Sequence, residues 1–244
     1  MHRTLLPSLY RGCTHPDKRT KELNELLQAI ENEKNLANEM KLNFEPECRF
    51  KLEGTLQHYG IPTHFIDVVD NHWIALWMGL YEVERSLRIL EYYHYKKREL
   101  PFGRYNIDFK DDQLYQYILL LAIPFSDEAI QKEGISVNSE FITVDLRTAL
   151  PSTFLRPHAQ HGLVVRKRGS DGNQISYYDL SSQVVGILRV RIDHADQWLG
   201  NGSLLTPENL FPAPGVDCGY DLLLSRNDIF ERQKYKDFSI TRYY

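Results

Sequence analysis

Cysteine is scarce in this sequence, and long apolar segments are missing. The 244 residues include three cysteines, Cys13, Cys48 and Cys218, which lie far apart and form no CxxC pair. An odd number of scattered cysteines argues against a disulfide framework and fits a reducing compartment. The longest apolar segments, such as YILLLAIPF, are too short to span a membrane, and no signal peptide is evident. We therefore expect a cytoplasmic protein that does not associate with membranes.

An excess of charge of either sign is also missing. The chain has 29 Lys and Arg residues against 33 Asp and Glu residues, which gives a formal net charge of −4. This balance does not require nucleic acid or an anionic membrane as a partner. A local basic patch could still pair with phosphates.

Several catalytic motifs are absent as well. The sequence has no GxGxxG after a predicted strand, no GxxxxGK[ST], no GxSxG and no HExxH. Rossmann, P-loop, serine-hydrolase and zinc-protease sites are therefore not indicated. Some histidines leave a metal-dependent hydrolase as a minor alternative: His58, His64, His72, His158 and His161. Their spacing matches no standard zinc pattern, so we expect no metal site.

Helical patterns dominate the first half of the chain and strand patterns the second. Residues 19–44 and 73–99 carry apolar side chains at helical spacing, and Asp70 or Asn71 is the expected N-cap of the second helix. Short segments rich in β-branched and aromatic residues predict strands at 113–125, 141–146, 162–168, 174–180 and 184–193. This order predicts a one-domain α+β fold.

The segment QHYGIPTHFIDVV, residues 57–69, is the strongest candidate for a site. Gly60 and Pro62 predict a sharp turn into the helix that follows. A turn alone does not require so many polar side chains, namely Gln57, His58, Tyr59, Thr63 and Asp67. Two interpretations stay open here: a binding site held on a rigid turn, or a structural turn with satisfied polar groups.

Four segments in this order resemble the FRG domain, which is named for a Phe/Tyr-Arg-Gly motif. They are LLPSLYRG (5–12), LQHYGIPTHFIDVVDNHWIALWMGLY (56–81), LRPHAQHGLVV (155–165) and LTPENLFP (205–212). The second is the most specific, although His64 stands where the family usually has Arg, and DVV from Asp67 replaces the usual Asp-Trp-Thr. LLPSLYR also resembles a downstream part of the family pattern, which would place the naming motif upstream of this chain and leave the role of Arg11 open.

The resemblance predicts an FRG-like domain over residues 1–224 and a C-terminal tail over 225–244. The domain divides into a mainly helical part, about 1–110, and a mainly β part, about 111–224. FRG domains look like distant relatives of ADP-ribosyltransferases, so the resemblance also implies a split β-sheet with N-terminal helices. It further implies that NAD is the cofactor.

The resemblance assigns site residues in two groups. The implied catalytic residues are Arg11, Tyr59 and Gln160. The implied NAD-binding residues are Arg11, Gln57, His58, Tyr59, Thr63 and Asp67. Gln160 is neutral, whereas the oxocarbenium-like state of ADP-ribosyl transfer usually pairs with a carboxylate. Another carboxylate such as Asp67 is therefore an alternative.

Two functions from different classes follow from the resemblance. The first is an ADP-ribosyltransferase-like effector that modifies a protein or nucleic acid in host–phage conflict. The second is a non-catalytic module that recognises a nucleotide, nucleic acid or protein through the same cleft. Convergence of Arg11, Tyr59 and Gln160 on one cleft would favour the first.

Overall fold

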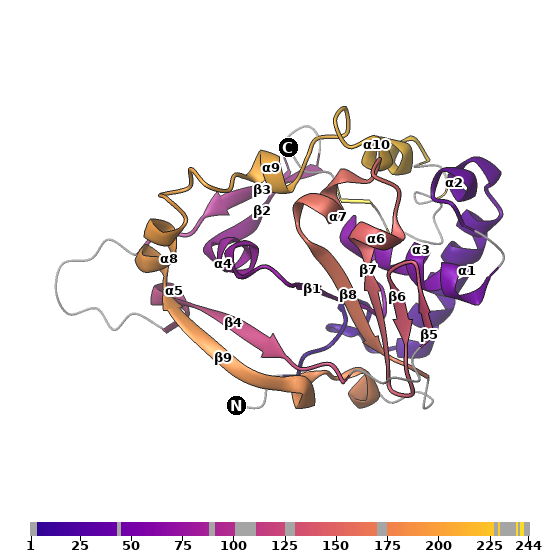
Figure 1. The fold of residues 1–244 in the computed structure, drawn as a ribbon, viewed down its shortest axis with the longest axis horizontal. Helices are drawn as coiled ribbons and strands as arrows, with labels where there is room; N and C mark the ends of the chain where they lie inside the picture. Colours follow the sequence, from indigo (N-terminus) through magenta and orange to yellow (C-terminus); the bar gives the residue numbers. More distant parts are fainter. Residues whose placement is uncertain are drawn as a thin grey trace.

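The computed structural model describes residues 4–42, 45–87, 91–100, 111–124, 130–169, 175–226, 229, 238 and 240–241 (Figure 1). The helices are η1 (Ser8–Tyr10), α1 (Pro16–Glu31), α2 (Lys34–Glu39), α3 (Pro46–His58), α4 (His72–Leu80), α5 (Asp111–Leu114), α6 (Leu146–Ala149), α7 (Leu155–Ala159), η2 (Ile175–Tyr178), η3 (Ser181–Gln183), α8 (Ile192–Trp198), α9 (Pro207–Leu210) and α10 (Cys218–Ser225). The strands are β1 (Ile66–Val69), β2 (Tyr81–Leu87), β3 (Glu91–Lys97), β4 (Tyr115–Leu121), β5 (Ile130–Lys132), β6 (Ile135–Val137), β7 (Phe141–Asp145), β8 (Gly162–Lys167) and β9 (Val184–Arg191). The α+β class predicted from the sequence is confirmed.

The largest sheet has five antiparallel strands in the order β1-β8-β7-β6-β5. Helix α3 packs across one face of it. A Cβ added to Gly54 of α3 would lie 2.8 Å from a methyl group of Val164 on β8. Glycine at this position therefore lets helix and sheet approach closely, which places the C-terminal end of α3 over β1 and β8.

The N-terminal helices cover the outer side of α3, at one end of the molecule (Figure 1). The predicted helix over 19–44 is present as two pieces, because Glu33 adopts an extended conformation between α1 and α2. The apolar face of α1 is fully buried, with Leu23, Leu26, Leu27 and Ile30 in the main core. Leu36 of α2 joins the same core, so the helical spacing identified the buried face correctly.

The prediction of one long helix over 73–99 is wrong after residue 80. Asn71 caps α4 as expected, because its side chain accepts hydrogen bonds from the backbone N–H groups of Trp73 and Ile74. The chain then forms the β2–β3 hairpin. Tyr81 stacks on Trp77 with ring centroids 4.3 Å apart, which fixes the exit from the helix. Aromatic and charged residues alternate in this part of the sequence, as is typical of a half-exposed hairpin. The alternation was overlooked because the apolar residues of the same segment also fit the spacing of a helix.

The predicted strand over 174–180 is also wrong, because its described part contains the 3-10 helix η2. Tyr178 stacks on Tyr10 of η1, with ring centroids 4.5 Å apart. This long-range contact overrides the local preference for a strand. The other predicted strands are present as β4, β7, β8 and β9.

A second, smaller core lies between α4 and α8, and the two-stranded β4–β9 ribbon runs along its side of the molecule (Figure 1).

Some residues of the predicted tail belong to the main core, since Phe238 and Ile240 are buried there. None of the helices formed by described residues has the length and apolar character needed to cross a membrane.

Candidate functional site

The QHYGIPTHFID segment forms the turn between α3 and β1. Gly60 has a φ of +97°, and a Cβ there would lie 2.0 Å from the hydroxyl oxygen of Thr241. Glycine is therefore required both for the backbone conformation and for space. The turn holds the last residues of α3 beside the first residues of β1, so side chains from both elements meet.

A polar cluster of Ser8, Gln57, His58, Thr63 and Asp67 occupies this junction. The amide oxygen of Gln57 accepts hydrogen bonds from the Ser8 hydroxyl at 3.0 Å, the Thr63 hydroxyl at 2.8 Å and the Thr63 backbone N–H at 3.2 Å. The Gln57 amide nitrogen donates to Asp67 Oδ2 at 2.7 Å. Gln57 is therefore the centre of the cluster and fixes the Asp67 carboxylate, whose side chain is 44% exposed.

His58 completes the polar cluster from its buried side. Its Nδ1 lies 3.2 Å from Asp67 Oδ1, and only 4% of its side chain is exposed. A carboxylate can only accept, so Nδ1 of His58 carries a proton and donates to Asp67. Nε2 is buried and has no hydrogen-bond partner among the described residues. A buried polar atom of this kind calls for an explanation, such as a ligand or an ordered water.

Gly162, at the start of β8, makes room for the His58 ring. A Cβ at this position would lie 2.6 Å from Cε1 and 2.7 Å from Nε2 of His58. We expect Gly162→Ala to push the ring away from Asp67 and to lower the free energy of unfolding by about 1–3 kcal/mol. Urea unfolding would measure the loss, with Gly215→Ala as the matched control because no atom lies within 4 Å of its added Cβ. Equal stability of the two variants would contradict this packing.

The three predicted catalytic residues lie in different surroundings. Tyr59 is fully buried, and its hydroxyl donates to Asp217 Oδ2 at 2.8 Å. Burial and the Asp217 carboxylate raise the pKa of Tyr59, so its hydroxyl remains a donor. Gln160 is 4% exposed, and its amide donates to the carbonyl of Leu210 at 2.7 Å. Arg11 is exposed, and its Nε donates to the carbonyl of Leu6 at 2.9 Å.

Direct hydrogen bonds therefore join four of the predicted binding residues, namely Gln57, His58, Thr63 and Asp67. No hydrogen bond described for Arg11, Tyr59 or Gln160 links one of these three to another. Sequence reasoning missed Ser8 and Gly162. Ser8 lies inside the LLPSLYRG segment that drew attention to Arg11, but nothing local to that segment indicates its contact with Gln57, which is 49 positions away.

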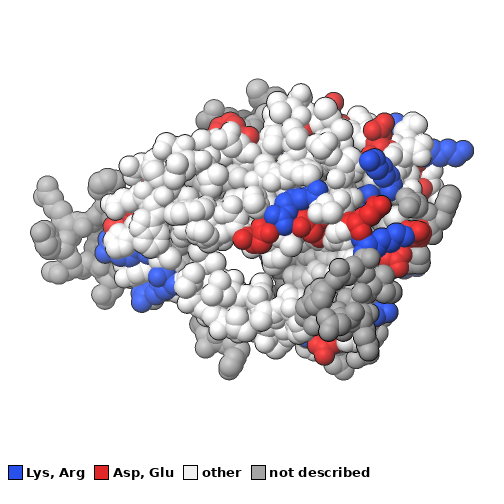
Figure 2. Space-filling view, in the orientation of Figure 1, with Lys and Arg blue, Asp and Glu red and all other residues white. Residues whose placement is uncertain are grey.

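A second polar network surrounds Arg147. Its guanidinium donates to both oxygens of Asp70, at 3.1 and 2.8 Å, and to both oxygens of Asp145, at 2.9 and 2.7 Å. The Nδ1 of His161 lies 3.0 Å from Asp70. Slight burial opposes ionisation of Asp70, but Arg147 and His161 outweigh it and lower the pKa of that carboxyl. In the face shown in Figure 2, charged groups of both signs are intermingled.

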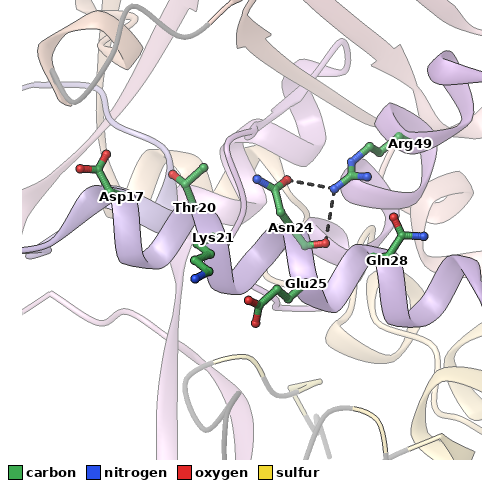
Figure 3. Close-up of a pocket in the computed structure, with 7 residues that line it drawn as sticks. All are labelled: Asp17, Thr20, Lys21, Asn24, Glu25, Gln28 and Arg49. Atoms are coloured by element: carbon green, nitrogen blue, oxygen red, sulfur yellow. Dashed lines mark hydrogen bonds between the residues drawn. The ribbon is translucent and has the colours of Figure 1, made fainter.

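An open cavity of about 470 Å³ lies along α1, away from these residues (Figure 3). The residues that line it are all of polar or charged types: Asp17, Thr20, Lys21, Asn24, Glu25, Gln28 and Arg49. Arg49 reaches across it to the side-chain and backbone oxygens of Asn24, at 3.0 and 3.4 Å. None of the predicted site residues lines this cavity. Among the described residues, no group of three or more His, Cys, Asp and Glu side chains could hold a metal ion.

The comparisons with known proteins agree with the resemblance in the first third of the chain. Residues 1–86 match the family model of the FRG domain. A search of curated proteins and a search of solved structures each found no match. The matched segment includes the whole polar cluster and Arg11, whereas Gln160 lies outside it. The predicted family is thus confirmed for this segment, and residues 1–86 belong to the FRG domain family.

Proposed function

We propose that this FRG-domain protein binds NAD or a related nucleotide at the polar cluster and acts as an ADP-ribosyltransferase-like effector. Its acceptor would be a protein or a nucleic acid, in host–phage conflict. One observation carries the proposal: Gln57 and His58 hold the half-exposed Asp67 carboxylate from two sides. A carboxylate fixed in this way needs little reorganisation when a ligand binds.

The chemistry of the reaction favours Asp67 over Gln160 as the acidic partner. ADP-ribosyl transfer breaks the bond between the nicotinamide nitrogen and the ribose carbon, and positive charge develops on the ribose. Asp67 is the one carboxylate among the predicted site residues. Gln57 and His58 each donate to a different oxygen of it, which fixes its orientation. Gln160 is neutral and already donates to Leu210.

The polar cluster and Arg11 offer groups that suit NAD. The exposed guanidinium of Arg11 can pair with a pyrophosphate, and the Asp67 carboxylate can accept from ribose hydroxyls. The buried Nε2 of His58 is a further polar atom without a described partner. Bound NAD would supply the ribose carbon and the nicotinamide leaving group. The chain would supply the phosphate donor and the fixed carboxylate.

A second candidate is a recognition module that binds a nucleotide, nucleic acid or protein without chemistry. The observation in its favour is that Tyr59 and Gln160 are both buried and hydrogen-bonded within the protein. Neither side chain is available at the surface, so a catalytic trio with Arg11 is not assembled there. Binding through the polar cluster alone would still be possible.

Nicotinamide release from NAD, measured with and without cell lysate as acceptor, separates the two candidates. We expect Asp67→Asn to reduce release roughly 100-fold or more, because the amide cannot balance the developing charge. Asp221→Asn is the matched control, since Asp221 is exposed on α10. NAD binding by calorimetry without release would support the recognition module. Absence of both binding and release would remove NAD from either proposal.

A further inference from the structure

The loop between α8 and α9 contains Asn201 followed by Gly202, the only Asn-Gly pair in the sequence. This loop runs along the outside of the molecule (Figure 1). Asn201 is exposed, and Leu204 in the same loop has 61% of its surface in water. Solvent therefore reaches the side-chain amide of Asn201, and asparagine is one of the chemically labile residues of proteins.

The backbone of the loop is left-handed over three consecutive residues. The φ angles are +65° at Gly200, +54° at Asn201 and +87° at Gly202. Asparagine is one of the few residues with a side chain that tolerate this region. The Asn201 N–H donates to the carbonyl of Asp196 at 2.8 Å, which anchors the loop on the N-terminal side of Asn201.

The two groups that follow this anchor are not held in the same way. Within the part of the chain that the structure describes, no hydrogen bond engages the side-chain amide of Asn201 or the N–H of Gly202. Gly202 also has no Cβ that would screen its nitrogen. The side chain of Asn201 can therefore turn toward the nitrogen of the next peptide unit.

We propose that Asn201 is a modification site, where the chain deamidates without an enzyme through a cyclic imide. The Gly202 nitrogen gives its proton to solvent and attacks Cγ of Asn201. The new N–Cγ bond closes a five-membered ring, the Cγ–Nδ2 bond breaks, and Nδ2 takes up a proton and leaves as ammonia. Water then opens the ring at either carbonyl, which yields aspartate or isoaspartate. The net reaction consumes one water and releases one ammonia.

Asn138 provides the comparison within the same chain, because a small residue, Ser139, also follows it. Its Oδ1 accepts from the backbone N–H groups of Glu140 and Phe141, at 2.8 and 2.6 Å. Its Nδ2 donates to the carbonyl of Pro124 at 2.8 Å. The fold thus fixes both ends of this amide, and ring closure would first have to break these hydrogen bonds.

The isoaspartate product would disturb the closure of the loop. The Ser203 N–H donates to the carbonyl of Gly200 at 3.2 Å, and the Leu204 N–H donates to that of Leu199 at 3.3 Å. Isoaspartate adds one carbon to the backbone between the partners of both hydrogen bonds. Leu199 is fully buried in the second core, so the added carbon loosens a loop that leaves this core.

The rate of deamidation in the folded and in the unfolded chain tests the proposal. The full chain is incubated at mildly alkaline pH, with and without guanidinium, and mass spectrometry of tryptic peptides follows Asn201 and Asn138 separately. We expect folding to slow Asn201 less than about tenfold and Asn138 more than about tenfold, because only the second amide is held. Each site is compared with itself, which removes the effect of the following residue. Equal protection of both sites by folding would overturn the proposal.

Gly202→Ala tests the attacking nitrogen. We expect it to slow deamidation at Asn201 at least about tenfold, because the methyl group crowds that nitrogen. Gly215→Ala is the matched control, since no atom lies within 4 Å of its added Cβ. The Cβ added at Gly202 would lie 3.2 Å from the hydroxyl oxygen of Tyr81, so circular dichroism must show that the variant is folded.

If Gly202→Ala does not fold, Asn201→Gln serves as the second variant, because its longer side chain must close a six-membered ring. The carboxyl methyltransferase that acts on isoaspartate, with labelled S-adenosylmethionine, should label aged wild type and not the folded variant. A folded variant that is labelled as fast as the wild type would contradict the proposed chemistry. The outcome does not involve NAD, so it is independent of the proposed function.

Discussion

Replacing Asp217 with alanine is expected to lower the free energy of unfolding by about 3–5 kcal/mol. Asp217 is fully buried. Its Oδ2 accepts from the Tyr59 hydroxyl at 2.8 Å and from the Arg156 backbone N–H at 3.0 Å. Its Oδ1 caps α10 by accepting from the Tyr220 N–H at 3.0 Å. The substitution leaves these three donors without their acceptor, and each lost bond in the interior is costly.

The setting of Arg156 increases this cost. Arg156 is fully buried, and its guanidinium packs 4.4 Å from the Tyr220 ring centroid and 4.7 Å from that of Tyr59. These rings attract the cation, but they do not replace a neighbouring carboxylate. Alanine at position 217 therefore also removes a negative charge from the surroundings of a buried arginine.

Urea unfolding of Asp217→Ala beside Asp221→Ala tests this account, because Asp221 belongs to the same helix but is exposed. Tyr59→Phe removes one of the three hydrogen bonds and should cost about 1–2 kcal/mol. If Tyr59 acts only in the core, Tyr59→Phe keeps the nucleotide affinity of the wild type. A loss of less than 1 kcal/mol for Asp217→Ala would contradict the assigned role of Asp217, since removing one partner of a buried charge costs several times more.

The contacts that sequence reasoning anticipated are local. Gln57 and Asp67 are ten positions apart, and the intervening Gly-Ile-Pro turn indicates that they meet. The cap of α4 at Asn71 is local as well. By contrast, the bond between Tyr59 and Asp217 spans 158 positions. No spacing rule connects such distant residues, so the aromatic character of Tyr59 suggested a ligand contact where the structure has a core hydrogen bond.

Contacts with distant residues also explain His64, which the sequence alone could not place. The sequence indicates only that histidine stands where arginine is usual. In the structure, the His64 backbone N–H and Nδ1 lie 3.0 and 2.7 Å from Glu53 Oε1. Arg166 of β8 donates to Glu53 Oε2 at 3.3 Å. Position 64 therefore belongs to a buried polar group centred on Glu53 of α3. This group depends on Arg166 of β8, which lies 113 positions after Glu53.

Glu53→Gln is expected to cost about 3–5 kcal/mol at neutral pH, because Arg166 loses its buried counter-charge. Glu53 is only 3% exposed. Burial alone would raise the pKa of Glu53, but the Arg166 guanidinium and the His64 imidazole overcome this and lower it to about 2. Guanidinium unfolding would measure the loss, with Glu84→Gln as the control. Glu84 pairs with Lys96 at the surface, where neutralising a carboxylate should change stability little.

The pH dependence of the free energy of unfolding shows whether Glu53→Gln acts through the lost charge or through altered packing. The pKa of Glu53 lies below its ordinary value of 4.5, so the ionised carboxylate stabilises the fold fully above that pH. The stabilisation is lost as the pH falls toward 2, and it amounts to roughly 3 kcal/mol. The difference in stability between wild type and Glu53→Gln should therefore shrink across this range, because Glu53 becomes progressively protonated and so approaches the neutral state of glutamine. A difference that stays constant from pH 7 to pH 2 would mean that glutamine disturbs the packing, and that the ion pair with Arg166 contributes little.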